Sequence, residues 1–299
     1  MDTNTTGFIY DETYLHHMLH EGHPESPGRL KAILKRLKDT GLDQEIYHIK
    51  PENEALKYIQ QVHSDSHISR VEEMAFDPTI CQLAVSGVLT AIDKVMNGTV
   101  KNAFCALRPP GHHATTGGEF GFCFYSNVAI GAKYAQSKYG LEKIMIVDWD
   151  FHHGNGTEWA FYSDPSVLFF STHSLYSFPM TGFVERNGEG EGMGYNINVP
   201  LPSYASDKDI LTAFETKLLP RAENFKPDLV FISAGFDSRK GDFLGDFEIT
   251  DSGFINLTKM IKSLATTYSE SRIISVLEGG YNPEGLALGV EAHIGALLE

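Results

Sequence analysis

The stretch IMIVDWDFHHGNG, residues 144–156 of a 299-residue chain, indicates both architecture and chemistry. Its first four residues form a continuous apolar run, which is typical of a strand buried on both faces in a parallel sheet. Asp148, Asp150 and His152 follow directly. Carboxylates buried at a strand exit need partners or a cation, and zinc accepts such oxygen and nitrogen ligands. Taken alone, the stretch fits a polar loop with capping aspartates equally well.

Further apolar runs alternate with helical patterns along the chain. Strands are predicted at 104–107, 144–147, 167–170, 229–232 and 273–277, and helices at 27–40, 127–139, 207–219, 251–266 and 284–298. In the first helix Ser26 is the expected N-cap, Pro27 the first helical residue and Gly41 the C-terminal stop. Gly140 is expected to end the second helix. The alternation predicts an α/β fold, a three-layer α/β/α single domain over residues 1–299 with a mainly parallel central sheet.

Charge and cysteine content limit the function and the setting of the chain. The formal net charge of −15 argues against a nucleic-acid partner. It could favour a cationic substrate such as a lysine-rich peptide or a polyamine, although solubility is the better explanation of the charge alone. Cys81, Cys105 and Cys123 form no CxxC pair, so we expect reduced thiols and a cytoplasmic location. Without a secretory pattern or a run of 18 apolar residues, we expect no membrane partner.

Three more polar motifs follow predicted strands. His112 and His113 come after a Pro-Pro-Gly turn beyond 104–107, whereas Asp237 follows 229–232 and Tyr281 follows 273–277. Ligand sites form at the carboxyl edge of parallel sheets. We therefore expect these segments to converge with the loop that begins at Asp148.

Each of these residues suits one part of a hydrolytic reaction. A histidine near a metal can act as a general base, with Asp148 and Asn155 as candidate partners that fix the tautomers. Asp237 would be a third metal ligand, and the Tyr281 hydroxyl would donate a hydrogen bond to an oxyanion. Taken singly, these residues also fit surface or core histidines, a helix N-cap and a loop tyrosine. Together they supply the parts of metal-assisted amide hydrolysis.

Five motifs carry a family resemblance, namely RPPGHHA (108–114), GFCFYSN (121–127), DWDFHHGNGT (148–157), SAGFDS (233–238) and LEGGYN (277–282). Over roughly residues 14–295 the chain resembles the histone deacetylase family, which has the arginase/deacetylase fold. The resemblance implies a zinc-dependent deacetylase that hydrolyses the acyl-amide of acetyl-lysine or of a similar acylated amine. One Zn²⁺ per chain would be bound by Asp150, His152 and Asp237.

The resemblance also implies catalytic roles. His112 and His113 would be tandem histidines, one of them acting as general base and later as acid. Asp148 would orient His112, Asn155 would support His113, and Tyr281 would stabilise the oxyanion. Asn155 in place of an aspartate is similar to class II and bacterial members. A tyrosine rather than a histidine at Tyr281 implies full hydrolytic competence.

Substrate and structural-ion sites follow from the same resemblance. An apolar channel would suit the aliphatic stem of lysine, and its residues would be Gly121, Phe122, Phe178 and Leu244. A structural K⁺ would bind, largely through backbone carbonyls, at Asp148, Asp150, His152 and Ser171. A second K⁺ would involve Phe161, Asp164, Val167 and Tyr195.

The segment before the first helix is rich in histidine. By composition His16, His17, His20 and His23 look like a metal cluster. We interpret them as a surface or substrate-rim loop, because the family places no metal there. Arg29, within the first predicted helix, would line an internal cavity for released acetate.

The amine of the substrate is the main open question. Polyamine-selective members carry a glutamate where this chain has Leu244, and an apolar gate favours acyl-lysine in peptides. Glu119 and the overall acidity keep an acetylpolyamine deacetylase as the alternative. An arginase-like ureohydrolase with two manganese ions would need more carboxylates around Asp237. A non-catalytic acyl-lysine-binding scaffold is disfavoured by the presence of His113 and Tyr281, and a homo-oligomer stays open.

Overall fold

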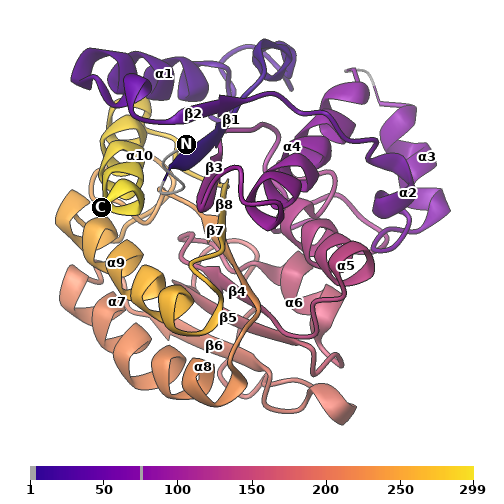
Figure 1. Cartoon of the computed structure of the whole chain (residues 1–299), viewed down its shortest axis with the longest axis vertical. Coiled ribbons are helices and arrows are strands. Elements are labelled where there is room, and N and C mark those ends of the chain that lie inside the picture. The colour runs from indigo at the N-terminus through magenta and orange to yellow at the C-terminus, as the bar shows by residue number, and fades with distance from the viewer. Residues whose placement is uncertain (1–4, 75–76) are drawn as a thin grey trace.

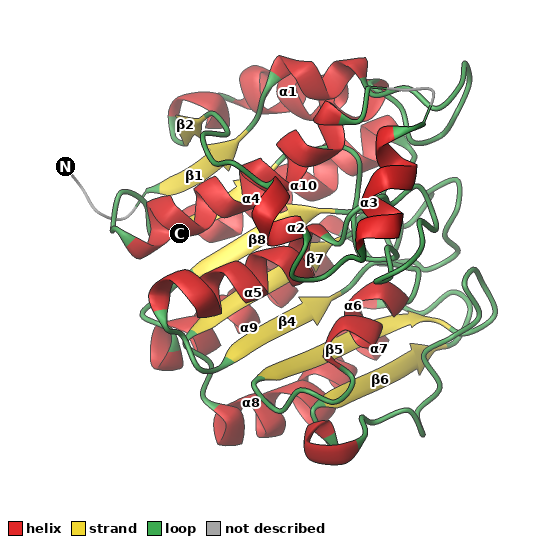
Figure 2. Cartoon of the chain, turned by 90° about the vertical axis from the view of Figure 1, so that its right-hand side faces the viewer, coloured by secondary structure: helices red, strands yellow, loops and turns green. Residues whose placement is uncertain are grey.

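One eight-stranded sheet organises the chain, which the computed structural model describes over residues 5–74 and 77–299. The strand order is β2-β1-β3-β8-β7-β4-β5-β6, and all neighbouring pairs are parallel (Figure 1, Figure 2). The strands are β1 (Thr6–Ile9), β2 (Tyr47–Ile49), β3 (Asn102–Cys105), β4 (Ile144–Asp148), β5 (Val167–Ser174), β6 (Asn196–Leu201), β7 (Leu229–Ala234) and β8 (Ile273–Leu277). Residues 1–4 and 75–76 of the domain predicted over 1–299 lie outside the described residues.

Helices cover both faces of the sheet, so the predicted three-layer α/β/α architecture is confirmed (Figure 1). One layer contains α1 (Gly28–Thr40), α7 (Asp207–Ala213), α8 (Leu219–Phe225), α9 (Asp251–Tyr268) and α10 (Pro283–Leu298). The other contains α2 (Leu56–Ile59), α3 (Asp65–Glu72), α4 (Thr79–Met96), α5 (Asn127–Tyr139) and α6 (Asn155–Phe161). Within the layers α1 packs on α10, α10 packs on α9, and α4 packs on α5.

The central strands account for the continuous apolar runs in the sequence. β4, β7 and β8 are buried along their whole lengths, because helices cover both faces of the sheet. β7 lies between β4 and β8, and β3 is the other neighbour of β8. The loops that leave the carboxyl ends of these four strands therefore lie at one edge of the sheet, on the right in Figure 2.

The start of α1 differs from its prediction, whereas two helix ends agree. α1 begins at Gly28 with Pro27 as its N-cap, and Ser26 accepts the Arg29 N–H through its backbone carbonyl instead of capping with its side chain. Gly41 and the residue after α5, Gly140, adopt the left-handed conformation that ends a helix.

Other predicted elements also have different bounds, and β5 continues past the predicted 167–170 to Ser174. β3 ends at Cys105 rather than Leu107, because its pairing with β8 stops there and the chain then turns toward Arg108. The helix predicted over 207–219 runs to Phe225 and contains a π-helical turn, Phe214–Leu218. Pro220 has no N–H to donate to a carbonyl four residues earlier, which interrupts the α-helical ladder at this point.

Sequence reasoning missed the strands β1, β2 and β6 and the helices α2, α3, α4 and α6. Among the described residues α4 is the one helix long and apolar enough, by length and composition, to cross a membrane, yet 67% of it is buried inside the protein. It packs against β1, β3 and β8 as a core helix. Gln82, Asp93 and Lys94 interrupt its apolar residues, so it did not form a continuous apolar run in the sequence.

The central position of β7 generates a stability prediction. Phe231 is fully buried, and Phe231→Ala should lower the free energy of unfolding by about 3–5 kcal/mol through lost burial and a residual cavity. Phe243→Ala, at a site that is 68% exposed, is the matched control and should change it by less than about 0.5 kcal/mol. Chemical denaturation measures both, and equal effects would contradict the proposed core.

Candidate metal and catalytic site

The carboxyl edge of the sheet brings the polar motifs together. Asp150 and His152 lie in the loop after β4, Asp237 in the loop after β7, and Tyr281 in the loop after β8. His112 and its neighbour follow β3. Because these four strands are contiguous in the sheet, segments from four distant parts of the sequence form one site.

Three side chains of this site could hold a metal ion. One ligand atom each from Asp150, His152 and Asp237 lies within 4.8 Å of the others. His152 Nδ1 lies 3.2 Å from Asp150 Oδ1 and 2.9 Å from Asp237 Oδ2. The predicted zinc ligands are thus brought together, with their donor atoms directed at one point.

The electrostatics of these three side chains fit a cation. Asp150 and Asp237 are buried. Burial, together with the charge of Asp150, raises the pKa of Asp237 to about 7. Burial lowers the pKa of His152, but hydrogen bonds to both carboxylates outweigh it and raise that pKa to about 10. The pair of buried carboxylates thus draws in positive charge, and two oxygens with one imidazole nitrogen are a ligand set that zinc accepts.

Glycine makes room for these carboxylates. A Cβ at Gly235 would lie 2.0 Å from Asp150 Oδ2, and one at Gly279 would lie 2.1 Å from Asp237 Oδ2. Gly279 also donates its N–H to Asp150 Oδ2 at 2.8 Å. Any side chain at either glycine would displace a metal ligand, a constraint that the sequence analysis did not identify.

The tandem histidines have different partners. His112 Nδ1 lies 2.9 Å from Asp148 Oδ2, and His113 Nδ1 lies 2.8 Å from Asn155 Oδ1, which are the pairings predicted from the sequence. Burial lowers the pKa of His112, but the charges of Asp150 and Asp148 outweigh it and raise that pKa well above its usual value. Burial and the neighbouring His112 lower the pKa of His113 well below its usual value. The pKa values of the two neighbouring imidazoles are therefore shifted in opposite directions.

A buried carboxylate that sequence reasoning missed supports the first histidine. Glu278 Oε2 accepts the backbone N–H groups of Gly111 and His112 at 2.7 and 3.1 Å. Burial raises the pKa of Glu278 to about 7. A glutamate at the end of a buried strand, just before two glycines, was the available signal for this role.

Aromatic residues surround the catalytic groups. The Phe122 ring lies 5.9 Å from the Tyr281 ring, and the Phe178 ring lies 5.1 Å from the His113 ring, measured between centroids. Gly121 has φ +52°, and a Cβ there would lie 2.2 Å from His113 Cδ2, so the turn brings backbone against the imidazole. The predicted channel residues therefore adjoin the site.

The fourth predicted channel residue lies farther out. Leu244 is 40% exposed, and its backbone N–H donates to Asp242 Oδ1 at 2.9 Å. Asp242 also accepts the backbone N–H of Tyr281, at 2.7 Å. Leu244 is thus tied to the loop that carries Tyr281, through an aspartate to which the sequence analysis gave no role.

The N-terminal segment is only partly the surface loop that was predicted. His16 and His20 are exposed, but His17 is fully buried, with its ring 5.6 Å from Phe124, so its assignment to the surface was wrong. The ring of His23 lies 4.5 Å from that of Phe122, beside the channel. Packing against the aromatic ring of Phe124 contributes to the burial of His17.

The two predicted potassium sites stay predictions. Ser171 pairs with Asp148 across β4 and β5, and its hydroxyl lies 2.9 Å from His173 Nδ1. The second set, Phe161, Asp164, Val167 and Tyr195, lies around the loop between α6 and β5. There the Asp164 carboxylate accepts a hydrogen bond from Lys133 at 2.7 Å.

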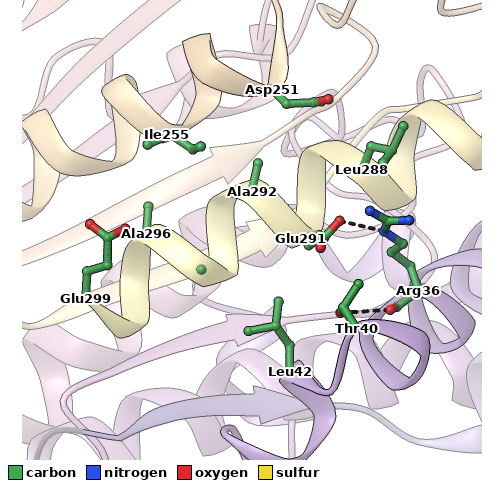
Figure 3. Close-up of a pocket in the computed structure, with 11 residues that line it drawn as sticks. Arg36, Thr40, Leu42, Asp251, Ile255, Leu288, Glu291, Ala292, Ala296 and Glu299 are labelled. Carbon is green, nitrogen blue, oxygen red and sulfur yellow. Dashed lines mark hydrogen bonds and ion pairs between the residues drawn. The ribbon is translucent and has the colours of Figure 1, made fainter.

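A separate cavity of about 520 Å³ lies between α1, α9 and α10 (Figure 3). Its charged groups are already paired, since Arg36 Nε bonds Glu291 at 2.5 Å and Asp251 bonds Arg239. The cavity contains none of the motif residues. Size alone therefore does not locate the chemistry of this chain.

Comparison with known proteins agrees with this geometry. The histone deacetylase domain model matches residues 23–297. Human histone deacetylase 9 is 36% identical, over 99% of this chain and 34% of its own length, so the chain spans about a third of that relative. A probable deacetylase of Archaeoglobus fulgidus is 35% identical, over 94% of this chain and 82% of its own length. The crystal structure of the HDA15 HD domain has a TM-score of 0.93 and 34% identity, covering 99% of this chain and 88% of that chain.

The ligand geometry predicts metal binding. Asp237→Asn should weaken Zn²⁺ binding by at least about 100-fold, because a neutral amide replaces a buried carboxylate ligand. Competition with a chromophoric chelator measures the affinity. Asp228→Asn, just before β7 at the opposite edge of the sheet, is the control and should bind Zn²⁺ like the unmodified protein. Unchanged affinity in Asp237→Asn would rule out this metal site.

Proposed function

This chain belongs to the histone deacetylase family, and on that premise we propose that it is a zinc-dependent deacetylase. It would hydrolyse the acyl-amide of an acetylated lysine or of a similar acylated amine. The observation that carries the proposal is the meeting of Asp150, His152 and Asp237 in one buried site that also holds the tandem histidines and Tyr281. Together these residues supply the ligands, the base and the oxyanion donor that metal-assisted amide hydrolysis needs.

Asp150, His152 and Asp237 would hold the Zn²⁺ ion. When bound, zinc supplies a Lewis acid that lowers the pKa of a coordinated water and polarises a carbonyl. The protein contributes the anionic, buried ligand set and the glycines that leave room for it. We extend the proposal to a structural K⁺ at Asp148 and Ser171, as the family resemblance implies.

His113 is the proposed general base. Its depressed pKa keeps the imidazole neutral, and its Nδ1–H donates to Asn155 Oδ1, so Nε2 carries the lone pair that accepts a proton from water. His112 cannot take this role while Asp148 keeps it charged. After the C–N bond breaks, His113 returns the proton to the leaving amine.

Tyr281 is the proposed oxyanion donor. It is buried, and burial with the charge of Asp237 raises the pKa of its phenol well above the usual value. The hydroxyl therefore keeps its proton and can donate a hydrogen bond to the oxygen of the acyl group as negative charge develops. Such a donor contributes most in a site from which water is excluded.

The channel supports acyl-lysine as the substrate class. Two carboxylates close to the channel are already engaged: Glu119 lies 3.4 Å from Arg70 and 3.5 Å from His67, and Asp242 accepts backbone N–H groups. Arg70 offsets the charge of Glu119, backbone N–H groups occupy the oxygens of Asp242, and Leu244 is apolar. An acetylpolyamine deacetylase is the second possible outcome of the substrate test below.

An arginase-like enzyme and a non-catalytic scaffold both fit this site less well. Across residues 5–74 and 77–299, one group of metal-binding side chains is found, which does not favour an arginase-like pair of manganese ions. A scaffold would not need a buried tyrosine and a neutral histidine beside the metal ligands. The cytoplasmic location, the absence of nucleic-acid and membrane partners and the oligomeric state stay predictions.

The role of Tyr281 predicts a large loss of rate. Tyr281→Phe should lower kcat by roughly 10²–10³ with a smaller change in KM, because one oxyanion donor is removed. Steady-state kinetics on an acetyl-lysine peptide measure the effect. Tyr204→Phe, at an exposed tyrosine, is the matched control and should keep full activity. An unchanged kcat in Tyr281→Phe would exclude the hydroxyl from the chemistry.

The apolar gate predicts substrate preference. The zinc-loaded protein should have a higher kcat/KM on an acetyl-lysine peptide than on N-acetylputrescine or N-acetylspermidine, measured side by side. Leu244→Glu should shift the ratio toward the polyamines by about 2- to 5-fold, the size expected of an exposed ion pair. Leu244→Gln, of the same shape without the charge, should leave the ratio near its original value. A native preference for polyamines would establish the polyamine substrate instead.

A further inference from the structure

We infer that Asp242 is a positioning residue for Tyr281, because its carboxylate ties the loop after β7 to the loop that carries the tyrosine. The inference rests on the proposed function, in which the Tyr281 hydroxyl acts on the substrate. Asp242 is not assigned to bind metal or substrate. It acts on the reaction only through the place at which it holds the tyrosine.

The contacts of Asp242 are specific and charge-assisted. Its Oδ2 atom accepts the backbone N–H of Tyr281 at 2.7 Å and that of Asn282 at 2.9 Å. Its Oδ1 atom accepts the N–H of Leu244 at 2.9 Å. The preceding carbonyl, Gly241 O, accepts the Asn282 side-chain amide at 2.9 Å. Hydrogen bonds to a carboxylate are roughly twice as strong as neutral ones, so this is a strong polar anchor on that side of the loop.

The tyrosine loop needs such an anchor. Tyr281 lies between β8 and α10 and follows Gly280, whose φ is +122°. Its N–H and that of Asn282 precede the first turn of α10, where no backbone acceptor is available within the helix. A carboxylate satisfies both donors and is also favoured by the dipole at the start of the helix.

A fully buried side chain, Arg29, holds the other side of the same loop. Arg29 donates from Nε to Gly280 O at 2.6 Å and from Nη2 to Glu278 O. Its guanidinium also lies over the Tyr281 ring, 5.1 Å from the centroid. The carbonyls of the loop are thus held by a cation and its N–H groups by an anion, which fixes the backbone on both sides of the tyrosine.

The anchor itself lies in an ordered loop. The Asp242 N–H donates to Arg239 O at 3.1 Å, and Lys240 N–H donates to Ile249 O at 2.9 Å. Arg239 forms two bonds with Asp251 at the start of α9. The loop that begins at the metal ligand Asp237 therefore transmits its position to Tyr281, and the two functional groups are set relative to each other.

The first experiment is a double-mutant cycle on kcat with the full-length, zinc-loaded protein and an acetyl-lysine peptide. Asp242→Ala should lower kcat by about 10- to 100-fold, since a displacement of about 1 Å can cost a factor of 10². In the Tyr281→Phe background the same change should lower kcat by less than about 3-fold, because the hydroxyl to be positioned is already gone. Zn²⁺ affinity should stay unchanged in all four proteins.

The structure offers a matched control for the loss of such an anchor. Asp228 Oδ2 also accepts two consecutive backbone N–H groups, those of Glu142 and Lys143, at 2.9 and 2.8 Å. Asp228 lies just before β7, and the two residues whose N–H groups it accepts lie just before β4, at the edge of the sheet opposite to the candidate site. Asp228→Ala should reduce stability to a similar extent as Asp242→Ala and leave kcat within about 2-fold of the unmodified protein.

Amide hydrogen exchange supplies a readout that does not depend on turnover. The segment 279–286 should exchange faster in Asp242→Ala and at the original rate in Asp228→Ala. Asp242→Asn keeps one acceptor oxygen but places an amide donor near the Leu244 N–H. Its exchange rate and its kcat should lie between those of the unmodified protein and those of Asp242→Ala. It also serves as the test if the alanine variant does not fold.

The outcomes separate this inference from the proposed function. If the unmodified protein does not deacetylate, the proposed function fails, and hydrogen exchange alone decides whether Asp242 holds the loop. If it does deacetylate, the effect of Asp242→Ala on kcat is compared in the unmodified protein and in Tyr281→Phe. An equal fold loss of kcat in both overturns the positioning role. Unchanged exchange of segment 279–286 in Asp242→Ala or Asp242→Asn overturns it as well.

Discussion

The burial of three aspartate carboxylates at one edge of the sheet is the constraint on which the rest of the site depends. Asp148, Asp150 and Asp237 have almost no contact with water, so each must be matched by hydrogen bonds or positive charge. Histidines and backbone N–H groups supply part of this, and a divalent cation between Asp150 and Asp237 would complete it. Gly235 and Gly279 leave space for the carboxylates of Asp150 and Asp237. His112 pairs with Asp148, and Glu278 holds the backbone just before that histidine.

The order of the strands in the sheet brings the buried carboxylates next to the other residues of the candidate site. β7 lies between β4 and β8, so the three candidate metal ligands and the tyrosine loop leave neighbouring strands. The carboxyl ends of parallel strands carry no further sheet hydrogen bonds, which frees their loops to present side chains. Charge is then distributed unevenly: the charges of Asp150 and Asp148 raise the pKa of His112, whereas burial and the neighbouring His112 lower the pKa of His113.

Much of the fold and most of the candidate site could be predicted from local sequence. Five buried strands are visible in the sequence as apolar runs. The pairs His112–Asp148 and His113–Asn155, which the family resemblance implied, are present in the structure. The prediction failed for the strands β1, β2 and β6 and for the helices α2, α3, α4 and α6. These short or mixed-polarity segments are stabilised by packing with distant elements, so their own patterns are weak.

The sequence by itself determined which functional side chains are present and which strands they follow, because apolar runs and polar motifs are local properties of the chain. Only the tertiary structure decided what holds these groups in place. Asp242 supports the tyrosine loop through backbone N–H groups, which every residue except proline possesses and which leave no mark in the sequence. The burial of His17 was hidden for the same reason, since it depends on which distant side chains pack around it.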